Sequence, residues 1–162
     1  MASKDSELVY AGFWYRCGAN LLDSLLIHLL IFALLLLVYG MIYLDDPKAY
    51  WGPAGALISY AMPPALILSF WIAKGATPGK MAIGATIVDS RTGGHPTARQ
   101  FVIRYFASIL SLLILFLGYF WIVFDARKQS WHDKFAGTVV VRRKAGIADQ
   151  VSFEAPLTGP MV

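Results

Sequence analysis

Arg16 and Asp23 are the residues whose types and spacing point most clearly to chemistry. They lie seven positions apart, or two helical turns, and so share one face of a helix. Asp23 falls inside a long apolar stretch, where an ionised carboxylate costs several kcal/mol unless it is paired or faces water. Such an acid is a candidate ionisable centre for a proton or a cation. The alternative is that Asp23 pairs with a basic residue and fixes helix packing, with Arg99 and Arg104 as the expected partners.

Asp133 is the expected partner of Arg16. Arg16 stands at the edge of the first apolar stretch and needs an acceptor there, and Asp133 lies in a polar segment that we place on the same side. A bidentate Arg–carboxylate pair is charge-assisted and stronger than a solvated surface pair. Exchanging the two charges should then restore expression that each single variant loses. His28 is five residues from Asp23, points to another helix face, and is expected to be a hydrogen-bonded packing residue rather than a proton relay.

Two patterns resemble catalytic motifs and fail on inspection. The segment 75–80 has three residues between its glycines where a phosphate-binding loop has four, and Met81 replaces the required serine or threonine. His132 and Asp133 are adjacent, so their side chains diverge by about 100° on a helix, and no nucleophile is placed nearby. The three histidines lack metal-ligand spacing. We therefore expect no enzyme, no cofactor and no bound metal.

The composition indicates the class of protein in which these residues are placed. Of 162 residues, 57% are hydrophobic and 15% are charged, and the mean hydropathy is +0.58. Soluble domains carry about 25% charged residues, so the chain as a whole is neither a soluble enzyme nor a disordered segment. The single cysteine, Cys17, excludes a disulfide framework and a four-cysteine zinc site. The excess of 14 Lys and Arg over 10 Asp and Glu is expected for the cytoplasmic side of a membrane protein and does not indicate nucleic-acid binding.

Three apolar stretches have the length of membrane spans. They run over about 18–44, 54–73 and 105–124. The first is too long for the core of a signal peptide, so we expect it to remain as an anchor. Pro63 and Pro64 in the middle of the second predict a kink.

The remaining segments predict a polar cap. The runs 85–88 and 138–141 are of β type, and the intervening turn and breaker residues indicate a hairpin within 74–104. Thr97 is an expected helix N-cap. Residues 125–134 are expected to be helical. This divides the chain into an N-terminal lead (1–15), a membrane domain (16–143) and a loose tail (144–162).

The positive charges favour one topology. Lys and Arg number 2 before the first stretch, 1 in 45–52, 5 in 74–104 and 6 after Phe124. If all three stretches cross, each side carries 7 and no orientation is preferred. If the third enters and returns near 117–118, the split becomes 13 against 1, a strong positive-inside bias. We therefore favour a re-entrant third segment, with a spanning one as the alternative, and cytoplasmic termini.

Several blocks, all in order, resemble the RDD family of small membrane proteins. They are Gly12 to Arg16 followed by Asp23, Thr77 to Lys80 with Gly84 and Val88, Arg104, Phe124 with Asp125, and residues 129–141. The resemblance covers roughly residues 10–143. The family is named for one arginine and two aspartates, which by position match Arg16, Asp23 and Asp133, with Asp125 or Asp89 as alternatives for the second aspartate. For this family, transport of unidentified ligands has been suggested, some relatives are credited with sodium/proton exchange, and others are accessory subunits of membrane complexes.

The expected protein is thus an all-α membrane protein with two transmembrane helices, a third re-entrant or spanning segment, and a small cytoplasmic cap like a β-hairpin. Its expected function is transport-related, with cation/proton exchange at Asp23 as the leading form. The alternative is a non-catalytic assembly or accessory subunit. The charge network of Arg16, Asp23, Arg99, Arg104 and Asp133 would serve either, with His28 and Asp125 as secondary members. The expected partners are the lipid bilayer and a second copy or another membrane protein, not nucleic acid, and the expected location is the bacterial-type cytoplasmic (inner) membrane.

Overall fold

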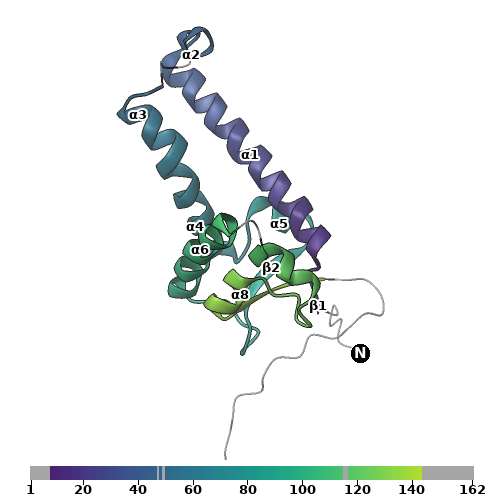
Figure 1. Cartoon of the computed structure of the whole chain (residues 1–162). Coiled ribbons are helices and arrows are strands. Elements are labelled where there is room, and N and C mark those ends of the chain that lie inside the picture. Colours follow the sequence, from purple (N-terminus) through teal and green to yellow (C-terminus); the bar gives the residue numbers. More distant parts are fainter. Residues whose placement is uncertain (1–7, 47, 49, 115–116, 144–162) are drawn as a thin grey trace, which may run out of the picture.

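Two long helical segments rise from a small cap of short helices and strands, and the chain turns between them at the end far from the cap (Figure 1). This computed structural model describes residues 8–46, 48, 50–114 and 117–143. The first and last strands both belong to one sheet in the cap. Residues 1–7 of the expected lead and the expected tail over 144–162 lie outside the described residues.

The first apolar stretch forms helix α1, Phe13–Tyr39, which has 27 residues. It is about 40 Å long, enough to cross the hydrocarbon core of a bilayer. The helix begins and ends earlier than the expected range of 18–44. It begins after Gly12, whose backbone is extended, and ends at Gly40, whose φ of 64° suits glycine. A short helix, α2 (Ile42–Asp45), follows. Arg16 therefore lies in the first turn of α1.

The second apolar stretch forms a helical segment over Pro53–Lys74. It consists of α3 (Pro53–Ala56), the π-helix η1 (Leu57–Ala61) and α4 (Met62–Lys74). Pro63 and Pro64 have no N–H, so the carbonyls four residues earlier lose their α-helical donors. Those carbonyls belong to Ser59 and Tyr60, which lie in the π-helical turn. The turn thus accommodates the two prolines without ending the helix.

Both segments are long and apolar enough to cross a membrane. In their most apolar windows only 11% and 6% of the residues are buried within the described chain. The core helix of a water-soluble protein would be mostly buried, whereas apolar faces exposed on this scale mark a membrane surface. The two segments therefore have the character of lipid-facing helices.

The third apolar stretch does not form the expected helix over 105–124. Helix α6 runs over Ala98–Leu113 and begins at a capping box, in which the Thr97 hydroxyl accepts from the Gln100 N–H and the Gln100 side chain accepts from the Thr97 N–H. This confirms Thr97 as an N-cap. Beyond Ile114 the next described elements are α7 (Leu117–Phe120) and the 3₁₀ helix η2 (Trp121–Val123). A Cβ on Gly118 would lie 2.5 Å from the Ser111 hydroxyl, so α7 returns closely against α6. The helix breaks earlier than 117–118.

The cap is built on a three-stranded antiparallel sheet in the order β1-β3-β2. The two β-type runs are β2 (Ala85–Asp89) and β3 (Thr138–Arg143), and they pair with Ala85 opposite Arg142 and Asp89 opposite Thr138. The predicted hairpin within 74–104 is wrong, because β2 pairs with β3 across the intervening helices. Strand β1 (Leu8–Tyr10) joins the other edge of β3.

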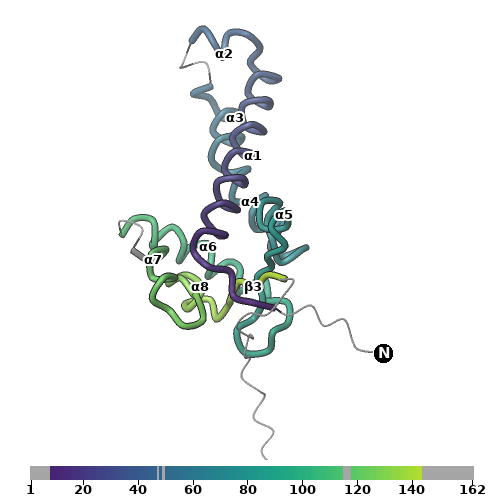
Figure 2. The backbone as a smooth tube through the Cα atoms, turned by 90° about the vertical axis from the view of Figure 1, so that its right-hand side faces the viewer, coloured from purple at the N-terminus to yellow at the C-terminus, as the bar shows by residue number. Residues whose placement is uncertain are grey.

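Two short helices complete the cap, and Figure 2 shows them beside the lower end of α1. Helix α5 (Pro78–Ala82) packs against α1, and α8 (Trp131–Ala136) packs against α6. The helix predicted over 125–134 is displaced along the chain. Helix α8 begins at Trp131, after the Ser130 N-cap, and ends at Ala136. Buried Ile87 and Val140 from the sheet, Phe101 from α6 and Trp71 from α4 form the core, so the end of the second span is anchored in the cap.

Candidate functional site

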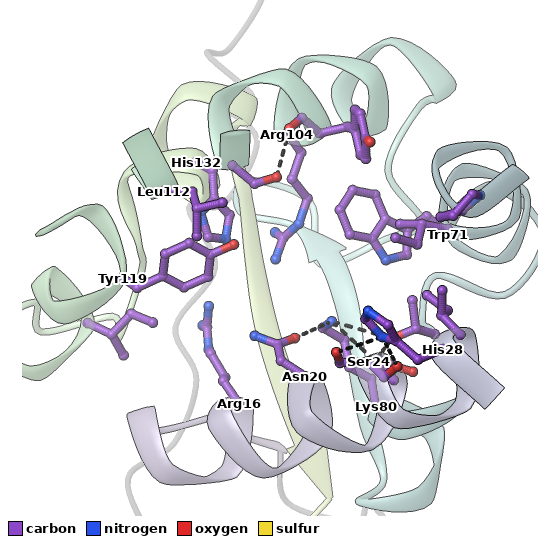
Figure 3. Close-up of a pocket in the computed structure, with 18 residues that line it drawn as sticks. Arg16, Asn20, Ser24, His28, Trp71, Lys80, Arg104, Leu112, Tyr119 and His132 are labelled. Carbon is purple, nitrogen blue, oxygen red and sulfur yellow. Dashed lines mark hydrogen bonds and ion pairs between the residues drawn. The ribbon is translucent and has the colours of Figure 1, made fainter. Parts of the chain in front are cut away.

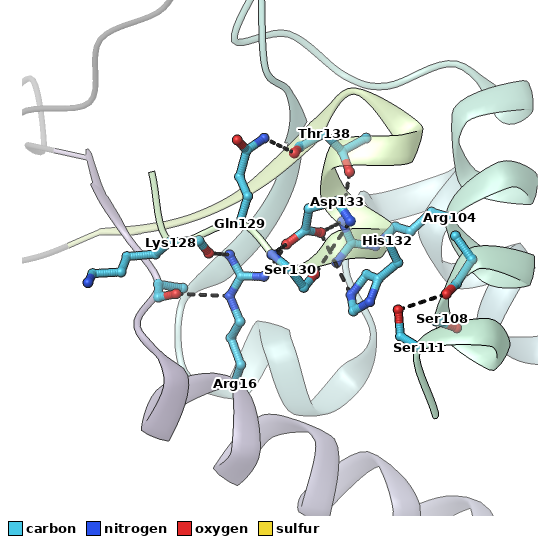
Figure 4. Close-up of polar contacts among 12 residues, drawn as sticks. Arg16, Arg104, Ser108, Ser111, Lys128, Gln129, Ser130, His132, Asp133 and Thr138 are labelled. Carbon is cyan, nitrogen blue, oxygen red and sulfur yellow. Dashed lines mark hydrogen bonds and ion pairs between the residues drawn. The ribbon is translucent and has the colours of Figure 1, made fainter. Parts of the chain in front are cut away.

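Asp133 is wholly buried and forms ion pairs with both Arg16 and Arg104 (Figure 4). Its position is fixed by the capping box at the start of α8, where the Ser130 N–H donates to the carboxylate over 3.0 Å. Arg16 also donates to the carbonyls of Ala11 (2.8 Å) and Lys128 (2.6 Å). The pairing of Arg16 with Asp133 is the one predicted from sequence. Arg104 was predicted to belong to the charge network as a partner of Asp23, but its contact with Asp133 was not predicted. That contact joins α1, α6 and α8 through one carboxylate.

Burial alone would raise the pKa of the Asp133 carboxyl, but the charges of Arg104 and Arg16 outweigh burial and hold that pKa well below its ordinary value. Burial lowers the pKa of the neighbouring His132 to about 3, so its imidazole is neutral. The His132 ring packs against Tyr119 with 4.8 Å between ring centroids. The site therefore contains an ionised carboxylate between two guanidinium groups and a neutral histidine.

Asp23 is held by the segment between α4 and β2, and not by the expected Arg99 or Arg104. The Thr77 hydroxyl donates to its carboxylate over 2.5 Å and the Gly79 N–H over 2.6 Å. Lys80 Nζ lies 3.9 Å from the same carboxylate. The prediction of its partners is wrong because Arg104 is engaged by Asp133, and because Arg99 is exposed at the start of α6.

Gly79 lets α5 approach α1 closely. A Cβ added there would lie 2.3 Å from the Ala19 carbonyl and 2.8 Å from the Asp23 carboxyl carbon. Gly79→Ala should therefore push the two helices apart and destabilise the protein by about 1–3 kcal/mol. Gly18→Ala is the matched control, because a Cβ on this α1 residue meets nothing within 4 Å, and it should be neutral or stabilising by up to ~1 kcal/mol. Thermal unfolding in detergent measures both, and equal midpoints for the two variants would refute the close approach.

Lys80 is a buried cation that sequence reasoning missed. Its side chain is 8% exposed, and its ammonium group donates to Asn20 Oδ1 over 3.1 Å and to Thr77 Oγ1 over 3.4 Å. Burial and the charge of Arg104 lower its pKa to about 8, against the opposing effect of Asp23. The segment 75–80 was set aside as an imperfect phosphate loop. Lys80 could have been recognised as a site residue because it belongs to the block Thr77 to Lys80, one of the blocks that resemble the RDD family.

These charged groups border a cavity of about 480 Å³ between α1, α4, α6 and the cap (Figure 3). Its polar lining includes Arg16, Asn20, Asp23, Ser24, His28, Thr77, Lys80, Arg104, Ser108, Tyr119 and His132. His28 is exposed and also borders this cavity, and its Nδ1 lies 2.7 Å from the Ser24 carbonyl. No group of three His, Cys, Asp or Glu residues that could hold a metal occurs among the described residues.

The other acidic candidates lie at the end of a strand (Asp89) and in a loop (Asp125). Asp125 pairs with Lys134 and accepts from the N–H groups of Arg127 (3.1 Å) and Gln129 (3.0 Å). Asp89 accepts from the Gln100 side chain over 2.6 Å and from two N–H groups of its own turn. Both carboxylates stabilise local loops and neither lines the cavity.

Comparisons with known proteins agree with the resemblance found in the sequence. The model of the RDD family matches residues 10–137. An uncharacterized membrane protein of Bacillus subtilis is 34% identical over 161 residues, which cover 87% of this chain and 88% of that protein. An uncharacterized protein of Rickettsia prowazekii is 40% identical over 75 residues, which cover 46% of this chain but only 41% of that protein. No solved structure matches. The chain belongs to the RDD family and is an integral membrane protein.

Proposed function

Starting from this RDD family membership, we propose that the protein acts in transport across the bilayer and that the Asp23–Lys80 pair is its ionisable centre. The observation that carries the proposal is a buried carboxylate and a buried ammonium group, 3.9 Å apart, that border a cavity of about 480 Å³ beside two apolar helices. Ionisable side chains at such a position are costly and are found where ions or protons move.

The pair is suited to a proton-linked step. The pKa of Lys80 is lowered to about 8, so its proton is lost at a pH close to that of a cell interior. Loss of that proton leaves the Asp23 carboxylate with the neutral donors Thr77 and Gly79 only, and makes the cavity more negative. This supports exchange of a proton at the centre, coupled to movement of a second ion.

Asp23→Asn tests the proposal, because asparagine keeps the shape of the side chain and removes its charge. The variant should accumulate in membranes like the wild type and lose ion flux in proteoliposomes, whereas Asp45→Asn, an exposed carboxylate beyond the end of α1, should keep both. Unchanged flux in Asp23→Asn would remove this residue from the mechanism.

An assembly or accessory role is the second candidate, and the buried contact of Asp133 with two arginines favours it. That contact joins α1, α6 and α8 and needs no solute to explain it. If Asp23 likewise only locks packing, Asp23→Asn should lose the protein itself. Two spans do not enclose a path by themselves, so either role calls for a second copy or another membrane protein.

We further propose that the protein lies in the bacterial-type cytoplasmic membrane with both termini and the cap in the cytoplasm, and that α6 and α7 enter and return on that side. The support is the 13-to-1 distribution of Lys and Arg. In a Cys17→Ser background, a membrane-impermeant thiol reagent added outside intact cells should label Asp45→Cys and spare Arg91→Cys, both of which are exposed positions. Labelling of Arg91→Cys from outside would contradict this orientation.

A further inference from the structure

The cavity beside Asp23 has the chemistry of an anion site with an apolar extension. We propose that it binds the oxyanion group of an amphiphile, a carboxylate or phosphate ester that carries an apolar chain. This proposal names the ligand class of the site on which the proposed function rests.

The charges around the cavity leave a positive excess. Arg16, Lys80 and Arg104 supply three buried cations. Asp23 and Asp133 supply two carboxylates, and His132 is neutral. One buried positive charge is therefore uncompensated by the described residues around the cavity. A buried charge without a counterion is costly, and an anion in the cavity would supply that counterion.

Two residues that line the cavity also carry a buried N–H donor without an acceptor. Trp71 Nε1 and Arg104 Nε have no hydrogen-bond partner among the residues that the structure describes, and both side chains are more than nine-tenths buried. Lys80 Nζ and the Arg104 guanidinium lie 5.9 and 5.3 Å from the centre of the Trp71 ring. Figure 3 shows Trp71, Arg104 and Lys80 around one common space. An unmet buried donor is costly, and the oxygens of one anion could satisfy both donors.

The side-chain oxygens of Asp23 and Asn20, which line the cavity, are already engaged. Both oxygens of Asp23 receive hydrogen bonds from Thr77 and Gly79, and Asn20 Oδ1 receives one from Lys80. The Asp23 carboxylate, the oxygen ligand that a metal cation would need most, already receives these hydrogen bonds, which favours an anion over a metal cation.

The rest of the lining is apolar and leads toward the lipid-facing helices. Ile27 of α1, Pro63 and Ile67 of α4 and Leu112 of α6 line the same cavity. A smaller cavity of about 100 Å³ shares Asp23, Ile27, Ile67 and Thr77 with it. Its other lining residues are Leu26, Leu30, Leu66, Phe70 and Pro78, so it extends between α1 and α4. An inorganic anion would make no polar contacts in this apolar extension, whereas an alkyl chain would fill it.

Equilibrium binding to the purified full chain in maltoside micelles tests the proposal with four probes: dodecyl phosphate, dodecanoate, dodecyltrimethylammonium and inorganic phosphate. Each of the two anionic amphiphiles should bind at least about tenfold more tightly than the cationic amphiphile and than inorganic phosphate. Trp71→Phe keeps an aromatic ring and removes the N–H, and should weaken binding of dodecyl phosphate about fivefold or more. Lys80→Gln should weaken it about tenfold or more. The control Trp51→Phe changes an exposed tryptophan in the loop after α2 and should bind like the wild type.

Equal binding of the anionic and cationic amphiphiles would overturn the proposal, as would equal affinities for Trp71→Phe and Trp51→Phe. Tight binding of inorganic phosphate, equal to that of dodecyl phosphate, would overturn the amphiphile assignment. The binding measurement is independent of flux. Anion binding without flux would contradict the proposed transport function alone, and flux without anion binding would contradict this ligand class alone.

Discussion

Replacing Asp133 with asparagine should remove most of the folded protein. Asp133 is wholly buried and is the counterion of two buried arginines, Arg16 and Arg104. Asparagine leaves both guanidinium groups without a charged partner, and removing one member of a buried ion pair costs about 3–5 kcal/mol. That loss is a large part of the 5–15 kcal/mol by which domains are typically stable.

The yield of monodisperse protein and its thermal midpoint in detergent measure this effect. Two controls bracket it. Asp45→Asn changes an exposed carboxylate and should match the wild type. Asp125→Asn weakens a pair whose lysine, Lys134, has a side chain 44% exposed, so its loss of ion pairing should be at most about 1 kcal/mol. If Asp133→Asn has the same thermal midpoint as Asp45→Asn, the buried charge cluster does not stabilise the fold.

The charge exchange between Arg16 and Asp133 distinguishes a simple pair from a shared carboxylate. For a simple pair, the double variant Arg16→Asp with Asp133→Arg should recover expression. In the structure the new arginine would face Arg104 at the position where Asp133 now contacts it. We therefore expect the double variant to be at least as poorly expressed as either single variant, contrary to the expectation from sequence.

The second large effect concerns pH and Lys80. Its folded-state pKa of about 8 lies below the ordinary value of 10.5, so between these two pH values the unfolded chain binds a proton that the folded chain does not. The free energy of unfolding should therefore rise with pH across this window, by up to about 3 kcal/mol from this group. Below pH 8 both states are protonated, and the cost of burying the ammonium group is fully present.

Lys80→Met isolates this contribution, because methionine keeps an unbranched apolar chain and has no titrating group. The wild type should gain stability relative to Lys80→Met between pH 8 and 10.5, with urea unfolding in detergent at several pH values as the measurement. Taking the difference between the two proteins removes the titration of tyrosines and other lysines. Parallel pH profiles would contradict the lowered pKa.

Much of the framework could be predicted from the sequence because its signals are local. Hydropathy located both spans. The first helix begins and ends about five residues earlier than the apolar stretch, because Gly12 and Gly40 set the ends of α1. The two β-type runs located from sequence are strands β2 and β3, although the hairpin predicted around the first of them does not form. The contact of Arg16 with Asp133 followed from one requirement, that an arginine at the edge of the apolar stretch needs an acceptor on its own side.

The parts that could not be predicted depend on contacts between distant segments. Lys80 and Asp23 meet only because α5 folds back on α1, and nothing in the residues around Lys80 indicates that it is buried. Arg104 was placed before the third span because the apolar run begins at Tyr105. The capping box at Thr97 starts the helix earlier and puts Arg104 inside it, where it can contact Asp133.

The measurement that tests the transport proposal most directly is the decay of an imposed pH gradient in proteoliposomes that contain the wild type or Asp23→Asn. The two samples are matched for the amount of folded protein and are assayed in sodium, potassium and lithium salts and with added dodecyl phosphate. With at least one of these ions, the wild type should dissipate the gradient faster than protein-free vesicles, and Asp23→Asn should match the protein-free rate. If the wild type matches protein-free vesicles with every ion, and Asp23→Asn instead lowers the thermal midpoint, the carboxylate is a structural lock and the transport proposal is wrong.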